Sequence, residues 1–393
     1  MASLSCEFPL ERITETELQD LCRVLWSWPP CEERRVGKPC ENCPPNRSKR
    51  LGQFFDYYKG LTASYDPDNG PGERPALSTH QNLFEIIQVL KAEPTRTRKQ
   101  LLHKAFPNEA GQCSVSATDQ ENAINLAVKI MIMVNCSAEH PSSGFIEDGT
   151  FQIPWRNDVT FTQFITDSFP MTDHPILNDD EELKKLDIKT ALTAKKLKKR
   201  AGLKFRPTDD LRSHLKFDRK TAVVEVYHHT AFLKEHLRLT KDKHLNVDVT
   251  EALKLGALPR QLALETLDSI QKILFPLADP KSRALLRSLT CTSSFDPDSL
   301  RFESASIRNG DEKDIRYHYL GARLADLYEE LENPTPRGME KWFQRKSGAR
   351  YVMMATFIGV VIAILFGMAG LALSIYQSWL TYQQWQHPIQ LVG

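Results

Sequence analysis

One uncharged hydrophobic segment, close to the C-terminal end of the sequence, constrains the fold more than any other feature. Residues 351–380 contain no Asp, Glu, Lys or Arg, and their apolar part, residues 352–375, is 24 residues long. An α-helix of that length measures roughly 36 Å at about 1.5 Å per residue, and a hydrocarbon core is about 30 Å thick. A buried helix of a soluble protein is the alternative, but such helices usually keep a polar face. The segment therefore predicts one transmembrane helix over residues 351–380.

The residues on either side of this segment predict its orientation. Residues 337–350 precede it, and their basic side chains are Arg337, Lys341, Arg345, Lys346 and Arg350. Residues 381–393 contain no Lys or Arg. Because positive charge stays on the cytoplasmic side, we expect a cytosolic N-terminal part, a basic juxtamembrane segment that faces lipid, and a short non-cytosolic tail. A span this close to the C-terminus indicates a single-pass, tail-anchored protein, of the endoplasmic reticulum or another secretory-pathway membrane rather than of mitochondria.

Small residues recur along the predicted span. Gly359, Ala363 and Gly367 follow one another at intervals of four residues, and Gly370 and Ser374 are also four residues apart. Such residues let the backbones of two membrane helices approach closely, which predicts a homo-oligomer through the transmembrane helix. The alternative is that Gly is simply frequent in membrane helices.

Composition limits what the rest of the chain can be. With 393 residues, of which 41% are hydrophobic and 26% charged, the sequence has the ordinary composition of a folded protein. Its length allows about two or three domains. The formal net charge is +1, so no bulk attraction to nucleic acid is expected and no nucleic-acid partner is predicted. All eight cysteines precede residue 351, on the side expected to face the cytosol, and we expect thiols rather than disulfides.

The chain before the membrane segment divides into four predicted parts. They are an N-terminal helix with a Pro- and Cys-rich linker, a helical unit, a winged-helix-like module, and a second helical unit with a β-hairpin: residues 1–77, 78–178, 179–245 and 246–336. The predicted fold class is therefore mainly α, with small β-hairpins and one C-terminal transmembrane helix.

Short patterns place several of these elements. Capping boxes predict three helix starts, at Thr14 with Glu17, Ser78 with Gln81, and Thr118 with Glu121. Asn309-Gly310 is a hairpin signal between residues 301–308 and 315–319.

The winged-helix prediction rests on the order of elements in residues 179–245. Helices are predicted over residues 190–200 and 208–217, a strand over residues 222–227 and a last helix over residues 230–239. Such modules bind either DNA or protein. Asp209 and Asp210, at the start of the second helix, would repel phosphate, which favours a protein-docking module.

Two groups of residues are candidate metal ligands. Cys40 and Cys43 have the spacing of half a zinc knuckle, and Cys31 could supply a third thiolate. A second pair of ligands at suitable spacing is missing, which favours a structural loop and leaves the zinc interpretation open.

The second group consists of four histidines in the winged-helix-like module, His214, His228, His229 and His236. Their spacing matches no zinc motif, which favours packed or hydrogen-bonded histidines over a metal site. No metal ligand is therefore assigned.

Parts of the sequence resemble a known group of proteins. Residues 208–215 (TDDLRSHL), 228–237 (HHTAFLKEHL), 329–338 (EELENPTPRG) and 340–356 (EKWFQRKSGARYVMMAT) resemble uncharacterised filamentous-fungal proteins with a single C-terminal transmembrane helix. The likeness covers most of residues 115–388 and implies no activity. Residues 226–237 are also similar to the His-x-Ser-Phe-x-x-x-Leu turn that ends the winged helix of fungal NACHT-type signalling ATPases. The sequence lacks a Gly-x-x-x-x-Gly-Lys-Ser/Thr phosphate loop, so this similarity implies a docking module and not nucleotide hydrolysis.

No pattern in the sequence carries catalysis. A nucleophile elbow, a phosphate loop and a Rossmann fingerprint are missing, so no catalytic residue, cofactor-binding residue or cofactor is predicted. The favoured function is a membrane-tethered protein-interaction or scaffold module on the cytosolic face, with an unknown protein partner. One alternative is a membrane-bound enzyme, which predicts a concave pocket where polar groups with shifted pKa values converge. The other is a nucleic-acid-binding winged helix.

Overall fold

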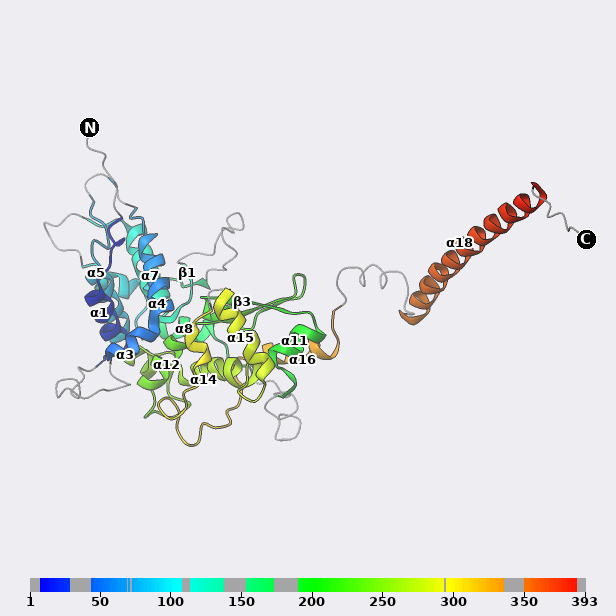
Figure 1. Ribbon diagram of the computed structural model, residues 1–393. Coiled ribbons are helices and arrows are strands. Elements are labelled where there is room, and N and C mark those ends of the chain that lie inside the picture. Colours follow the sequence, from blue (N-terminus) through cyan, green and yellow to red (C-terminus); the bar gives the residue numbers. More distant parts are fainter. Residues whose placement is uncertain are drawn as a thin grey trace, which may run out of the picture. The chain divides into compact units, whose positions relative to one another are not determined.

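The structure is a computed structural model, and it describes residues 8–28, 44–68, 70, 73–107, 114–137, 153–172, 190–292, 295–335 and 350–386. These residues are mainly α-helical, with a few short strands and one long C-terminal helix, which confirms the predicted fold class. The chain divides into two units, Met1–Asn333 and Pro334–Gly393 (Figure 1). Several predicted site residues lie outside the described residues: Cys31, Cys40, Cys43, Arg337, Lys341, Arg345 and Lys346.

Helices make up most of the N-terminal part of the first unit. They are α1 (Glu15–Trp26), α3 (Pro44–Ser48), the 3-10 helix η1 (Lys49–Leu51), α4 (Gly52–Ala63), α5 (His80–Ala92), α6 (Arg98–Ala105), α7 (Ala117–Ile132) and α8 (Phe161–Ser168). Two short parallel strands, β1 (Cys136–Ser137) and β2 (Ile153–Pro154), lie between α7 and α8 in the chain. Figure 1 shows α5 beside α7, and α5 also packs on α1.

The predicted helix starts are close to the observed ones. Thr14 and Glu17 form the predicted capping box of α1. The other two helices begin one residue later and two residues earlier than predicted, after Thr79 and Ser116. In each case a neighbouring Ser or Thr has the same capping ability, so the pattern alone leaves the first residue uncertain by one or two positions.

The segment predicted as a winged-helix-like module contains a small mixed sheet. Its elements are α11 (Ala194–Arg200), β3 (Lys204–Thr208), the 3-10 helix η2 (Leu211–Ser213), β4 (Phe217–Asp218), β5 (Val223–Tyr227) and α12 (Thr230–Leu239). The strand order is β3-β5-β4, with β3 parallel and β4 antiparallel to β5. The strand predicted over residues 222–227 and the helix predicted over residues 230–239 are confirmed as β5 and α12.

The helix predicted over residues 208–217 is wrong. Its first residue ends β3, and only one 3-10 turn follows, in which the Asp210 carboxylate accepts the N–H of Arg212 at 3.0 Å. Leu215 then adopts a φ of 60°, and its N–H donates to the carbonyl of Glu225 in β5 at 2.7 Å. The backbone bonds that stay within this segment are those of 3-10-type turns, and the N–H of Leu215 bonds to the sheet, so the second helix that a winged helix requires does not form.

The C-terminal part of the first unit is also helical. Its elements are α13 (Val249–Leu255), α14 (Arg260–Asp268), the π-helix η3 (Ser269–Leu274), α15 (Pro280–Thr292), the 3-10 helix η4 (Pro297–Leu300) and α16 (Gly321–Glu332).

The hairpin predicted around Asn309-Gly310 is wrong, because residues 301–320 form turns without a strand. Buried side chains of α14 explain the difference. Arg260 donates to the carbonyl of Ile307 at 2.9 Å, and Glu265 accepts the N–H groups of three successive residues from His318 onward. The backbone groups that would pair with each other in a hairpin are thus hydrogen-bonded to side chains of α14 instead.

Two hydrophobic clusters fill the first unit. The larger cluster, core A, has members between Leu10 and Ile315, and the smaller one, core B, has members between Leu192 and Leu331. The continuous run of α14 and η3 passes from one to the other, since Leu267 belongs to core A and Ile270 to core B. A π turn contains more residues than an α turn, so it changes the direction in which the following side chains point. This change lets the same run of helix contribute first to core A and then to core B. Core A takes residues from all four predicted parts of the chain.

The second unit contains α18 (Arg350–Gln386), the apolar helix expected from the sequence. Its segment Thr356–Gln386 is 31 residues long, contains an 18-residue stretch with a mean hydropathy of 2.5, and is long and apolar enough to cross a membrane. The small residues Gly359, Ala363, Gly367, Gly370 and Ser374 all lie on this helix and are exposed. Pairing through them stays a prediction.

Candidate functional site

A groove of about 850 Å³ lies where residues of α4, α7, β2, β3, η2 and α16 meet. We call it the Asp209 groove. The ionisable side chains that line it are Tyr57, Lys129, Arg206, Asp209, Asp210, Arg212, Lys216, Glu225 and Arg323. It is the concave pocket with convergent polar groups that the enzyme alternative predicted, so the state of these groups decides what the groove can do.

Two histidines hold the carboxylate of Asp209, which follows β3. The Nε2 atoms of His228 and His229 both donate to Asp209 Oδ1, at 3.1 and 2.7 Å. The side chain of Asp209 remains 54% exposed. Its partial burial raises its pKa, but the hydrogen bonds from the two rings outweigh this effect, and the pKa of Asp209 lies well below its usual range. Asp209 therefore presents a permanent negative charge to the groove.

These three residues also have the composition of a metal site, since their ligand atoms lie within 4.8 Å of one another. The tautomer of His228 argues against this interpretation. Its Nδ1 accepts the N–H of Asp296 at 3.1 Å, so the neutral ring carries its proton on Nε2. A protonated Nε2 has no lone pair for a metal and can only donate to Asp209. The geometry fits a hydrogen-bonded carboxylate better than a metal centre.

His229 holds Asp209 from a buried position. Its side chain is 1% exposed, and its ring lies 5.5 Å from that of Tyr57 and 5.6 Å from that of Tyr227. Burial lowers the pKa of His229 to about 4, although the hydrogen bond to Asp209 opposes this shift. A general base must offer a free nitrogen to the substrate. In His229, Nε2 donates to Asp209 and Nδ1 is buried, and His229 does not line the groove. His229 therefore offers no free nitrogen to a ligand in the groove.

Two basic side chains of the groove have no hydrogen-bond or ion-pair partner among the described residues. Lys129, in the last turn of α7, and Arg212, in η2, are both half-buried. Burial lowers the pKa of each, although nearby aspartates oppose the shift. The other cations are engaged, since Arg206 pairs with Glu225 and Arg323 donates to two backbone carbonyls. Lys129 and Arg212 are therefore available to an anionic ligand.

Contacts at the end of α7 bring these two cations together. Met133 ends α7 with a φ of 55°, and its carbonyl accepts the N–H of Leu211 at 3.0 Å. The hydroxyl of Tyr227 lies 2.9 Å from the Met133 sulfur. α7 is thus joined to η2 and β5, so Lys129 and Arg212 line one groove although 83 residues separate them in the chain.

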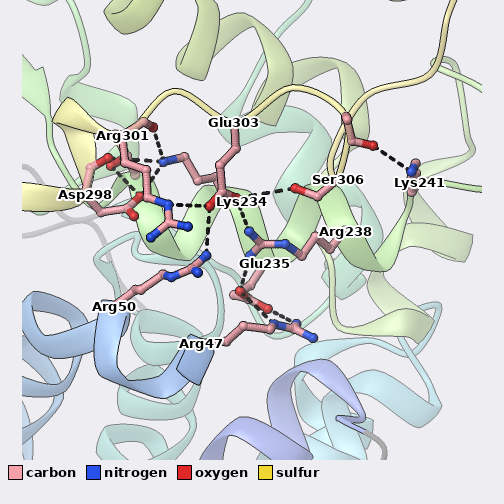
Figure 2. Close-up of polar contacts among 12 residues, drawn as sticks. Arg47, Arg50, Lys234, Glu235, Arg238, Lys241, Asp298, Arg301, Glu303 and Ser306 are labelled. Atoms are coloured by element: carbon pink, nitrogen blue, oxygen red, sulfur yellow. Dashed lines mark hydrogen bonds and ion pairs between the residues drawn. The ribbon is translucent and has the colours of Figure 1, made fainter. Parts of the chain in front are cut away.

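A buried ion pair, shown in Figure 2, fixes α12, the helix that directly follows the two histidines. Lys234, whose side chain is 2% exposed, lies 2.6 Å from the carboxylate of Asp298 and donates to the carbonyl of Arg301 at 2.7 Å. Asp296 accepts the N–H of Ala231 at 3.2 Å and donates its own N–H to His228. The segment from Phe295 to Arg301 therefore fixes the ring of His228, and the hydrogen bond from this ring helps to keep Asp209 ionised.

A second set of ion pairs joins α12 to the N-terminal part of the unit. Glu235 binds Arg47 and Arg238, while Glu303 binds Arg238 and lies 2.8 Å from Arg50. Figure 2 shows these arginines approaching the two carboxylates from different segments of the chain. Because each of these side chains lies against an opposite charge, with the arginines sharing the two carboxylates, we assign the set a structural role.

The structure separates the four histidines that the sequence grouped together. His228 and His229 hold Asp209. His214 bonds through Nε2 to a serine hydroxyl of η3 at 2.6 Å, and His236 accepts the N–H of Leu258 at 3.0 Å. Burial lowers the pKa of both to about 3. The prediction of packed or hydrogen-bonded histidines is confirmed for all four.

The sequence did not identify Lys129, Asp209 and Arg212 as members of one site. The sequence predicts Asp209 in the first turn of a helix that does not form, and Lys129 lies on a helix with no distinguishing pattern. The only available signal was the pair of adjacent histidines after a predicted strand.

Comparison with known proteins adds no identification to this geometry. No family model, no curated protein and no solved structure matches the chain.

Proposed function

We propose that this chain is a membrane-tethered interaction protein whose first unit binds a segment of a partner protein in the Asp209 groove. The membrane attachment is supported by α18, which is long and apolar enough to span a bilayer. The basic residues before α18 and the tail without Lys or Arg support a single-pass, tail-anchored arrangement with the first unit in the cytosol. A secretory-pathway membrane is part of the same proposal.

One observation supports the binding function: two cations that make no ion pair line the same groove as a carboxylate that is held in place. Lys129 and Arg212 are half-buried and make no ion pair or hydrogen bond with the described residues, although Asp209 and Asp210 lie near enough to attract them, and such charges are stabilised further when a ligand supplies an anion at bonding distance. Asp209 adds an acceptor that stays ionised. A partner segment with an acidic side chain and a nearby N–H or hydroxyl donor would satisfy all three groups.

A membrane-bound enzyme is the second candidate, because the groove gathers titratable groups with shifted pKa values. The histidines weigh against it. Both present a donating Nε2 to Asp209, so neither can accept a proton from a groove ligand. The groove therefore has the groups for recognition but lacks a positioned base among its histidines.

Site-specific photo-crosslinking of the full chain in its native cell tests the proposal. A photoreactive amino acid at Ser213, which lines the groove, should give one discrete protein adduct. Changing Lys129→Met together with Arg212→Met should abolish the adduct. Changing the exposed pair Lys59→Met and Arg23→Met should leave it intact. An adduct that survives the loss of both groove cations would overturn the proposal.

A further inference from the structure

A second groove, of about 1410 Å³, lies between α11 and the start of α15 on the surface of the first unit. Its lining is strongly basic. Of its described residues seven are Lys or Arg, and one, Asp279, is acidic. The carboxylate of Asp279 is already engaged, because it accepts the hydroxyl of Ser282 at 2.7 Å and the N–H of Lys281 at 3.0 Å. One carboxylate cannot neutralise seven basic side chains, so the groove keeps a net positive charge.

Most of these cations have no partner among the residues that the structure describes. Lys196 donates to the carbonyl of Thr190, and Lys272 pairs with Asp268, both at 2.9 Å. The side chains of the other five are exposed and make no hydrogen bond or ion pair with any residue that the structure describes: Lys195, Lys198, Lys199, Arg200 and Lys281. Such a concentration of unpaired charge on one face attracts an anionic surface.

The backbone that carries these side chains is rigid. Ala194 and Leu197 of α11 are fully buried in core B. The N–H of Lys195 donates to the hydroxyl of Ser282 at 3.0 Å, which joins α11 to α15. The five cations are therefore presented from a folded face and not from a flexible tail.

An exposed leucine lies beside this basic groove. Leu277 is 54% exposed, and its chain neighbours Pro276 and Ala278 both line the groove. Outside α18, large hydrophobic side chains this exposed are scarce in the part of the chain that the structure describes. Basic residues around an apolar side chain are typical of protein surfaces that bind the interface of an anionic bilayer.

We propose that the face formed by α11, the loop of Leu277 and the start of α15 docks on an anionic lipid surface. This inference rests on the membrane attachment proposed for α18. Only residues 334–349 separate the first unit from α18, and a chain of that length spans at most about 60 Å. The tether therefore keeps the first unit at a high effective concentration near the bilayer, so a weak individual affinity is sufficient.

A nucleic acid and an acidic protein are the competing occupants. Single-stranded nucleic acids are held by aromatic side chains on which bases stack, and none of the described residues that line the groove is aromatic. An acidic protein would bind the cations but would not require Leu277 to be apolar. The role of Leu277 therefore separates lipid from protein.

The experiment compares the full chain in nanodiscs of phosphatidylcholine alone with nanodiscs that also contain phosphatidylserine. Rates of lysine acetylation are measured by mass spectrometry. Lys198, Lys199 and Lys281 should react several-fold more slowly in the anionic nanodiscs, while Lys59, exposed on α4, should react equally in both. Changing Leu277→Gln, which removes the apolar character without adding a charge, should remove most of this protection without altering the thermal unfolding temperature.

Each outcome has a definite meaning. Equal acetylation rates in both nanodiscs would overturn the inference. Protection that appears only when RNA or an acidic polypeptide is added would overturn it in favour of that occupant. A chain that fails to enter either nanodisc would instead refute the membrane attachment itself.

Discussion

Acidification should destabilise the first unit, because three of its buried histidines resist protonation while the chain is folded. Burial lowers the pKa of His214, His229 and His236 to about 3, 4 and 3. In an unfolded chain the pKa of His is about 6.5. Between these values the unfolded state binds protons and the folded state does not. The stability that the neutral histidines contribute is therefore fully present above a pH of about 6.5 and is lost as the pH falls towards the folded pKa values.

The expected loss between pH 7 and pH 5 is large. Each histidine contributes about 2 kcal/mol over this interval at about 1.36 kcal/mol per pH unit, which gives about 6 kcal/mol for the three. Asp296 acts in the opposite direction, since burial raises its pKa to about 6 and its folded form takes up a proton first. That effect restores about 1 kcal/mol, so these four groups together give a net loss of about 5 kcal/mol, comparable with the whole stability of many domains. Burial also raises the pKa of Asp210 and Glu265, which offsets part of this loss.

Urea unfolding of the full chain in detergent at pH 7 and pH 5 measures this loss. Fluorescence is a suitable signal because Trp26 and Trp155 are buried in core A. The unfolding midpoint should fall strongly at pH 5. A control variant, His236→Asn, retains an acceptor for the N–H of Leu258 but cannot titrate, so the pH dependence should decrease by about one third. Equal midpoints at the two pH values would refute the reasoning.

Three further predictions concern the ion pair, the membrane helix and the orientation of the chain. Lys234→Met should lower the free energy of unfolding by about 3–5 kcal/mol because it leaves Asp298 buried without a counter-ion, and adding Asp298→Leu should restore much of it; urea unfolding that shows additive losses would contradict this. Gly367→Ile should abolish dimers of the full chain in detergent if α18 pairs through its small residues, which analytical ultracentrifugation can measure. Asn46 and Asn135, both in glycosylation sequons, should carry no glycan, and a mobility shift after endoglycosidase treatment would place the first unit in the lumen instead.

Local patterns predicted the elements whose hydrogen bonds stay local. α12 begins and ends at the predicted residues, and the capping box at Thr14 is present, because both depend on neighbours within one or two turns. The two wrong elements, the helix over residues 208–217 and the hairpin around residue 309, fail for a common reason. Polar groups from distant segments took the backbone donors and acceptors that the predicted element needed.

The nature of the candidate site depends on contacts of the same long-range kind. The sequence grouped four histidines by their proximity in the chain, but the role of His228 is decided by the N–H of Asp296, which is 68 residues away. That single donor places the imidazole proton on Nε2, and Nε2 then holds Asp209 as an ionised acceptor. With the opposite tautomer the same residues would offer a nitrogen to a metal or to a substrate. Whether these residues bind a partner or perform chemistry therefore follows from how the segment around Asp296 packs against α12, and no pattern within residues 208–237 could have shown it.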